Sequence, residues 1–163
     1  MRLKLKQLMA MQDELDCRIF NQHKITREAT HQRRILAALV EIGECANETR
    51  CFKFWSIKKP SEVMVILEEY VDILHFMLSL AIDYQIQIEE LEAMKANEDL
   101  SMAFLDLYRM VADLTINDKA DLFENSFAYF LGLGEGLGFD EKMVIDAYNM
   151  KNAENFKRQD RNY

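Results

Sequence analysis

Residues that interrupt helices are scarce in this chain. One proline and five glycines occur among its 163 residues, and four of the glycines fall within the segment GLGEGLG. Apolar residues recur at helical spacing, as Leu8, Met11, Leu15 and Ile19 do near the start. Because glycine and proline disfavour helix interiors, this pattern predicts an all-α multi-helix bundle. The length suits a single domain over residues 1–163.

Six helices are expected from the apolar periodicity and its breaks. They are predicted at residues 3–20, 27–55, 61–84, 100–114, 119–131 and 140–158. Pro60 marks the clearest break, because proline is tolerated at the start of a helix. We interpret GLGEGLG as a helix end and turn. It is not a phosphate-binding loop, because no strand is expected before it and no Gly-Lys-Ser/Thr follows it.

Charge and hydropathy exclude several classes of protein. The formal net charge of −8 argues against general nucleic-acid binding, which needs a basic stripe. The chain has no run of about 20 uninterrupted apolar residues and no signal-peptide pattern, so we expect a cytoplasmic protein without a membrane span. The three cysteines are expected to be reduced thiols. We interpret five local basic residues as a solvated face: Arg33, Arg34, Lys53, Lys58 and Lys59.

Two pairs of acidic residues lie inside otherwise apolar helices. Glu41 and Glu44 occur in ALVEIGECANE, and Glu69 and Asp72 occur in ILEEYVDILHF. Residues at i and i+3 share one face of a helix, so two neighbouring helices could bring the four carboxylates together. Such a group would repel itself unless it held cations, and hard divalent ions prefer oxygen ligands. Spacing alone leaves a four-carboxylate metal site and a solvated acidic face equally open.

The order of these motifs resembles a known family. ExxE, then 24 intervening residues, then ExxD resembles the all-α MazG-like nucleoside triphosphate pyrophosphohydrolases. LMAMQDELD, EIGECANE followed by Trp55, EEYVDILHF and YNMKNAENFKRQD look more closely like the dimeric, all-helical dUTPases of phages, some bacteria and trypanosomatids. The resemblance implies a homodimeric dUTP diphosphatase that releases dUMP and pyrophosphate, with dUDP as a further candidate substrate.

The resemblance also implies two or more Mg²⁺ ions, for which Mn²⁺ could substitute. The implied ligands are Glu41, Glu44, Glu69 and Asp72. Magnesium would neutralise the triphosphate and activate a water, and Glu44 or Glu41 would orient or deprotonate that water. Asn47 and Glu48 would form hydrogen bonds to the metal ligands and so orient them. Glu68 would face away from the site.

Substrate contacts are implied on three other segments. Lys151, Asn155 and Arg158 share one face of the closing helix and would meet the phosphates, although a solvated basic helix end remains the alternative. The remaining candidates are Gln12 for the uracil edge, Trp55 over the base, and His75 and Phe76 against the sugar. Trp55 as a core residue and His75 as a buried, backbone-satisfied histidine are the structural alternatives.

Other functions stay open at this point. A related enzyme acting on dCTP or a damaged nucleotide would share the metal site and differ in its base contacts. A di-iron bundle would need Glu-x-x-His on two helices, and only Asp72 and His75 resemble half of that pattern. The non-enzymatic reading is a helical dimerisation or regulatory module, and an enzyme could also bind a regulatory protein.

The chain departs from the family pattern in two places. Residues 87–118 contain few motif residues and are interpreted as a lineage-specific helix or insert. The closing RQD is followed by Arg161, Asn162 and Tyr163, where the family pattern has glycine and tyrosine.

Overall fold

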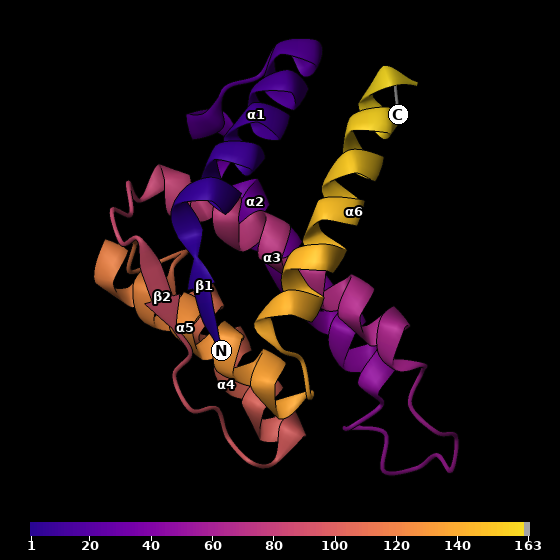
Figure 1. Cartoon of the computed structure of the whole chain (residues 1–163). Helices are drawn as coiled ribbons and strands as arrows, with labels where there is room; N and C mark the ends of the chain where they lie inside the picture. Colours follow the sequence, from indigo (N-terminus) through magenta and orange to yellow (C-terminus); the bar gives the residue numbers. More distant parts are fainter. Residues whose placement is uncertain (162–163) are drawn as a thin grey trace.

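Six helices and one pair of short strands make up residues 1–161, the part of the chain that the computed structural model describes (Figure 1). The helices are α1 (Leu5–His23), α2 (Arg27–Thr49), α3 (Val63–Asp83), α4 (Leu100–Asp113), α5 (Ala120–Gly136) and α6 (Glu141–Asp160). The strands are β1 (Arg2–Lys4) and β2 (Glu90–Glu92). The predicted all-α fold is therefore confirmed. Of the departure at the C-terminus, Asn162 and Tyr163 lie outside the described residues.

Side-chain caps set the start of three helices. The side chains of Thr26, Asp99 and Asp140 each accept a hydrogen bond from a backbone N–H in the first turn of the helix that follows. The second helix ends at Thr49 because Arg50 takes a left-handed conformation, with φ of 57°. The expectation that this helix continues to residue 55 was therefore wrong.

Helix α3 is the central element of the bundle. Twelve of its 21 residues are buried, which fits a helix with neighbours on most sides. α2 packs antiparallel to it, since Arg34 contacts Asp83 at one end and Cys45 contacts Ile66 at the other. α1 and α6 also pack against α3, as Figure 1 shows, and they contact each other. This arrangement places α1, α2 and α6 around a shared stretch of α3.

The first residues of the chain form a two-stranded β-ribbon with a segment that is far away in the sequence. β1 and β2 are antiparallel, and buried Leu3 lies opposite buried Leu91. Arg2 and Lys4 point outward on either side of Leu3, which is the alternation of a strand. We expected a helix to begin at residue 3. It begins at Leu5 because the residues before it form strand β1, which pairs with β2.

The glycine-rich segment GLGEGLG lies mostly inside a helix. α5 continues to Gly136, so the interpretation of this segment as a helix end and turn was wrong for its first five residues. A Cβ atom on Gly132 would lie 1.8 Å from the backbone oxygen of Met94, and one on Gly134 would lie 2.4 Å from the Tyr70 hydroxyl. These two glycines permit the helix to approach its neighbours closely.

None of the helices in the described part of the chain is long and apolar enough to cross a membrane.

Candidate functional site

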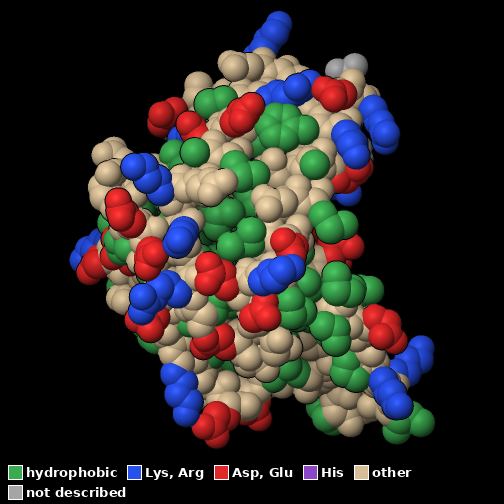
Figure 2. Space-filling view, in the orientation of Figure 1, with side chains coloured by type: hydrophobic (Ala, Val, Ile, Leu, Met, Phe, Trp, Pro, Cys, Tyr) green, Lys and Arg blue, Asp and Glu red, His purple; other side chains and the backbone are tan. Residues whose placement is uncertain are grey.

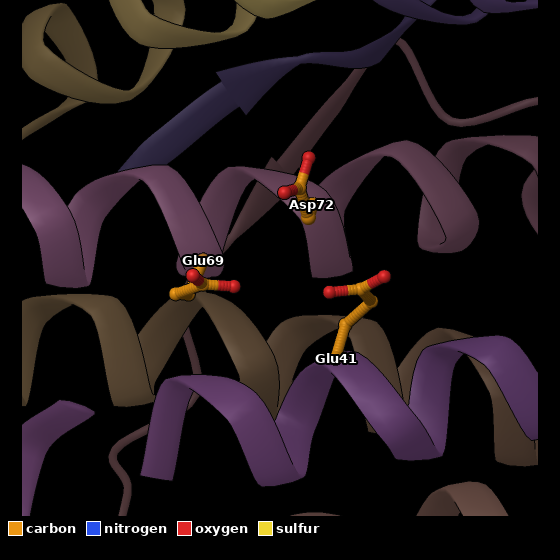
Figure 3. Close-up of side chains that lie close together, drawn as sticks. All are labelled: Glu41, Glu69 and Asp72. Atoms are coloured by element: carbon orange, nitrogen blue, oxygen red, sulfur yellow. The ribbon is translucent and has the colours of Figure 1, made fainter. Parts of the chain in front are cut away.

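Three carboxylates from two helices converge between α2 and α3. Glu41 comes from α2, and Glu69 and Asp72 come from α3. One oxygen from each side chain lies within 4.8 Å of the others, and Figure 3 shows the three side chains close together where α2 and α3 face each other. All three are partly buried. We call Glu41, Glu69 and Asp72 the carboxylate cluster.

Helical spacing beside the core explains this convergence. Glu69 and Asp72 are three residues apart and share a face of α3, whereas their neighbour Val71 is fully buried. Glu41 likewise precedes the fully buried Ile42 on α2. Because the two apolar stripes pack together in antiparallel fashion, the acids at their edges meet. The packing of the core therefore forces like charges close together.

The electrostatics of the cluster favour a bound cation. Burial raises the pKa of Glu41 to about 7, and the nearby Asp72, Glu44 and Glu69 add to the shift. Burial also raises the pKa of Glu69 and of Asp72. Carboxylates that are partly desolvated and repel one another, with oxygens at this separation, fit a divalent ion with oxygen ligands. The donor set therefore fits magnesium or manganese.

Two further acids lie near the cluster in different settings. Glu44 is exposed and stands outside the group of converging oxygens, although its charge raises the pKa of both Glu41 and Glu69. Glu68 is exposed and pairs with the half-buried Lys151 at 2.9 Å. Lys151 also contacts Asp72 at 2.7 Å, so one ammonium bridges the cluster to Glu68.

A pocket of about 440 Å³ opens beside the cluster and extends between α1, α2, α3 and α6. Seven of the predicted site residues line it: Gln12, Glu41, Asp72, His75, Phe76, Asn155 and Arg158. Motifs that are far apart in the sequence thus share one cavity, with carboxylates and basic residues among its lining.

Gln12 is held by a buried hydrogen-bond network. Its Oε1 accepts from His75 Nδ1 at 2.8 Å and from the Tyr148 hydroxyl at 3.1 Å, while its Nε2 donates to Asp16 at 2.8 Å. Because Oε1 can only accept, Nδ1 of His75 carries the proton and Nε2 is left as an acceptor. Nε2 is buried and has no hydrogen-bond partner among the described residues. Burial lowers the pKa of His75 to about 3, so the ring is neutral.

Asp16 and Arg34 line the inner end of the pocket, and Arg27 and Asp83 lie beside them; the sequence analysis did not predict this group of charges. Arg34 is buried, although we interpreted it as part of a solvated face, and it pairs with Asp83 at 2.6 Å. Arg27 contacts the buried Asp16 at 3.1 Å and Asp83 at 3.2 Å. Ser79 donates a hydrogen bond to Asp16 and accepts one from Arg34. We call Asp16, Arg27, Arg34 and Asp83 the buried ion-pair network.

Six predicted site residues do not line the pocket: Glu44, Glu69 and Lys151, which lie at or beside the carboxylate cluster, and Trp55, Asn47 and Glu48. Trp55 is in the loop after α2, is 65% exposed and does not line the cavity, so its place over the base stays a prediction. Asn47 and Glu48 contact that loop instead of the carboxylate cluster: Lys53 donates to Asn47, and Ser61 donates to Glu48. They join the helix end to the loop.

Comparison with known proteins agrees with the all-helical fold. A family model described as dUTPase matches residues 4–163, which is nearly the whole chain. No curated protein matches the chain. dUTPases act on a nucleotide and use divalent metal ions, a requirement that the carboxylate cluster can meet. The chain therefore belongs to the all-helical dUTPase family and is a nucleoside triphosphate pyrophosphohydrolase, a dUTP diphosphatase.

Proposed function

We propose that the chain hydrolyses dUTP to dUMP and pyrophosphate with Mg²⁺ held by the carboxylate cluster together with Glu44. The observation that carries this proposal is the convergence of three partly buried carboxylates beside a pocket of nucleotide-compatible size. Bound magnesium would supply positive charge against the phosphates and make a coordinated water more acidic. Mn²⁺, which accepts the same oxygen ligands, is expected to substitute.

Basic residues of α6 are assigned to the phosphates. Lys151 reaches Asp72 and Glu68 from α6, and Arg158, farther along the helix, lines the pocket beside the carboxylate cluster. Phosphoryl transfer depends mainly on positioning and charge compensation. The two cations would fix the triphosphate along the edge of the cluster, so that the phosphorus to be attacked lies near the carboxylates.

Glu44 is assigned to the attacking water. It lies one helical turn beyond Glu41 and outside the group of converging oxygens. A carboxylate in that position can accept a hydrogen bond from water while its neighbours hold cations. Glu41 is the other candidate for this role.

The deoxyribose and base are assigned to the inner half of the pocket. Nε2 of His75 is a buried acceptor without a partner in the described residues, which suits a sugar hydroxyl that donates a hydrogen bond. Phe76 lies on the same lining, where its ring would pack on the sugar and disfavour a 2′-hydroxyl. Asn155 and the second N–H of the Gln12 amide would form hydrogen bonds to the edge of uracil.

We also propose that the active form is a homodimer. Large apolar side chains are exposed on the loop after α2 and on the first turn of α3, as expected for a surface that a partner covers.

The test is pyrophosphate release from dUTP, dTTP, dCTP and UTP, with and without Mg²⁺. The wild type is expected to prefer dUTP and to require the metal. Glu69→Gln should lose at least about a hundredfold in rate, whereas Glu68→Gln, the adjacent exposed acid, should remain within about threefold. Equal rates on all four nucleotides, or an unimpaired Glu69→Gln enzyme, would overturn the proposal.

A further inference from the structure

A series of buried polar side chains connects the buried ion-pair network to His75. Charged side chains mostly lie on the molecular surface, as Figure 2 shows for one face, but Asp16 is only 5% exposed. Gln12, His75 and Ser79 beside it are also buried. They come from α1 and α3, which pack against each other. Because a buried donor must face an acceptor, each side chain in the series fixes the orientation of the next.

The series begins at the Asp16 carboxylate, which can only accept hydrogen bonds. Its Oδ2 accepts from the Ser79 hydroxyl and lies 3.1 Å from the Arg27 guanidinium. Burial raises the pKa of Asp16, while these donors and the charge of Arg34 oppose the rise and favour the ionised form. The other oxygen, Oδ1, faces Gln12 at 2.8 Å. The atom of Gln12 that points toward Asp16 is therefore the amide nitrogen Nε2.

The Gln12 amide passes this constraint to His75. With Nε2 directed at Asp16, Oε1 lies 2.8 Å from His75 Nδ1. The Tyr148 hydroxyl, whose oxygen accepts from Asn152, also donates to Oε1. Because Oε1 can only accept, Nδ1 must carry the ring proton. Burial lowers the pKa of His75 to about 3, so the ring is neutral and Nε2 carries no proton.

We propose that Asp16 is a positioning residue that sets the tautomer of His75 through Gln12, and that this tautomer selects nucleotides whose 3′ group donates a hydrogen bond. Nε2 of His75 is buried and has no hydrogen-bond partner within residues 1–161, and the residue lines the pocket. An unprotonated nitrogen there accepts from a hydroxyl but repels a group that can only accept. The inference rests on the proposed function, which places the deoxyribose at His75.

An amide at position 16 should reverse the whole series. In Asp16→Asn, the side-chain oxygen must stay toward Ser79 and Arg27, because both donate, so the new nitrogen faces Gln12. Gln12 would then turn its Oε1 toward position 16 and its Nε2 toward His75. Nδ1 would become the acceptor, and Nε2 would carry the proton. The reversed series keeps its hydrogen bonds, so the fold should survive.

Nitrogen-15 NMR of the imidazole ring measures the tautomer without any nucleotide. The chain has three histidines, so the His75 signals are assigned by their loss in His75→Gln. We predict a proton on Nδ1 in wild type and on Nε2 in Asp16→Asn. A wild type with the proton on Nε2, or an Asp16→Asn variant with an unchanged tautomer, would overturn the proposal.

Asp13→Asn is the matched control for this measurement. Asp13 is an acid on the same helix, and it contacts Arg27 at 2.7 Å, but within residues 1–161 it has no hydrogen bond to Gln12. The control therefore removes a charge beside the same arginine and should keep the proton on Nδ1. A tautomer change in Asp13→Asn as well would contradict a specific role for Asp16.

Two nucleotides test the consequence for recognition. kcat/KM is compared for dUTP and for its 3′-fluoro-2′,3′-dideoxy analogue, in which fluorine replaces the hydroxyl and cannot donate. Wild type and Asp13→Asn should prefer dUTP by at least about tenfold, and Asp16→Asn should lose most of this preference. A general structural defect would lower both values and leave their ratio unchanged. An unchanged ratio in Asp16→Asn would therefore contradict the proposed selection.

Moving the carboxylate along the series supplies a rescue. In Asp16→Asn with Gln12→Glu, the carboxylate at position 12 accepts from the amide at position 16 and from His75, so the proton returns to Nδ1. The preference for the 3′-hydroxyl should return with it, although the rate stays low because Gln12 is assigned to uracil. A proton that remains on Nε2 in this variant would overturn the proposal.

The two readouts separate this inference from the proposed function. If the tautomer switches and recovers as predicted but wild type does not hydrolyse dUTP, only the proposed function fails. If wild type hydrolyses dUTP and the tautomer is the same in every variant, only the role of Asp16 fails.

Discussion

Two groups of charge each have members in the lining of the same pocket, and they are balanced in opposite ways. The buried ion-pair network contains two aspartates and two arginines at contact distance, so these four charges sum to zero. The more exposed Asp13 also contacts Arg27, and His31 contacts Asp83. The carboxylate cluster contains three acids with Glu44 beside them, and Lys151 contacts one of the three. The network is complete without a ligand, whereas the cluster is not. We interpret the network as charges that hold the fold, and we propose that the cluster binds cations and substrate.

The sharpest test of this contrast removes one acid from the cluster. Glu41→Gln is expected to lower the rate of dUTP hydrolysis by about a thousandfold, while stability in EDTA stays the same or rises because repulsion is relieved. Steady-state kinetics and urea unfolding measure the two effects. Hydrolysis within tenfold of wild type would mean that the cluster is not catalytic.

Removing a charge from the network should have the reverse outcome. Arg34→Met leaves Asp83 with a buried, partly unpaired carboxylate, and we expect the free energy of unfolding to fall by about 3 kcal/mol. The exposed neighbour Arg33→Met should change stability by no more than about 0.5 kcal/mol. Equal effects of the two substitutions would contradict a structural role for Arg34.

Metal binding should stabilise only through the cluster. At a Mg²⁺ concentration one hundred times its dissociation constant, the free energy of unfolding should rise by about 2.7 kcal/mol. The Arg34→Met variant should keep this increment, and Glu69→Gln should lose most of it. Thermal unfolding with and without Mg²⁺ gives the comparison, and an unchanged increment in Glu69→Gln would count against the ligand set.

The smallest effect concerns pH in the absence of metal. Burial and neighbouring acids raise the pKa of Glu41 from 4.5 to about 7 in the folded state. The folded chain therefore binds this proton more tightly, so the contribution to stability is present below pH 4.5 and is lost as pH rises through about 7. Urea unfolding in EDTA should show a steeper loss between pH 5 and 7 for wild type than for Glu41→Gln. Parallel curves would show that this carboxyl does not titrate as the structure indicates.

Periodicity along single helices could be predicted from the sequence. The i, i+3 spacing put Glu69 and Asp72 on one face of a predicted helix at the edge of an apolar stripe, and the structure places them together there. The interruption near Pro60 likewise separates α2 from α3. These features depend on residues within a few turns of one another, which is the range over which a sequence pattern carries information.

Features that depend on distant partners could not be predicted. The partner of Arg34 is Asp83, 49 positions away, and nothing near Arg34 distinguishes it from the exposed Arg33. β1 is three residues long and pairs with a segment near residue 91, so its alternation was too short to recognise. Position 132 requires glycine because the backbone of Met94 lies against it. The sequence alone shows only a glycine-rich segment, which is typical of a turn.

The central claim is that the carboxylate cluster is a divalent-metal site, and Mn²⁺ binding followed by electron paramagnetic resonance tests it most directly. Wild type, Glu69→Gln and Glu68→Gln would be titrated with Mn²⁺ without nucleotide. We predict that Glu69→Gln loses at least tenfold in affinity while Glu68→Gln stays within about twofold of wild type. Equal Mn²⁺ affinity in all three proteins would contradict the account.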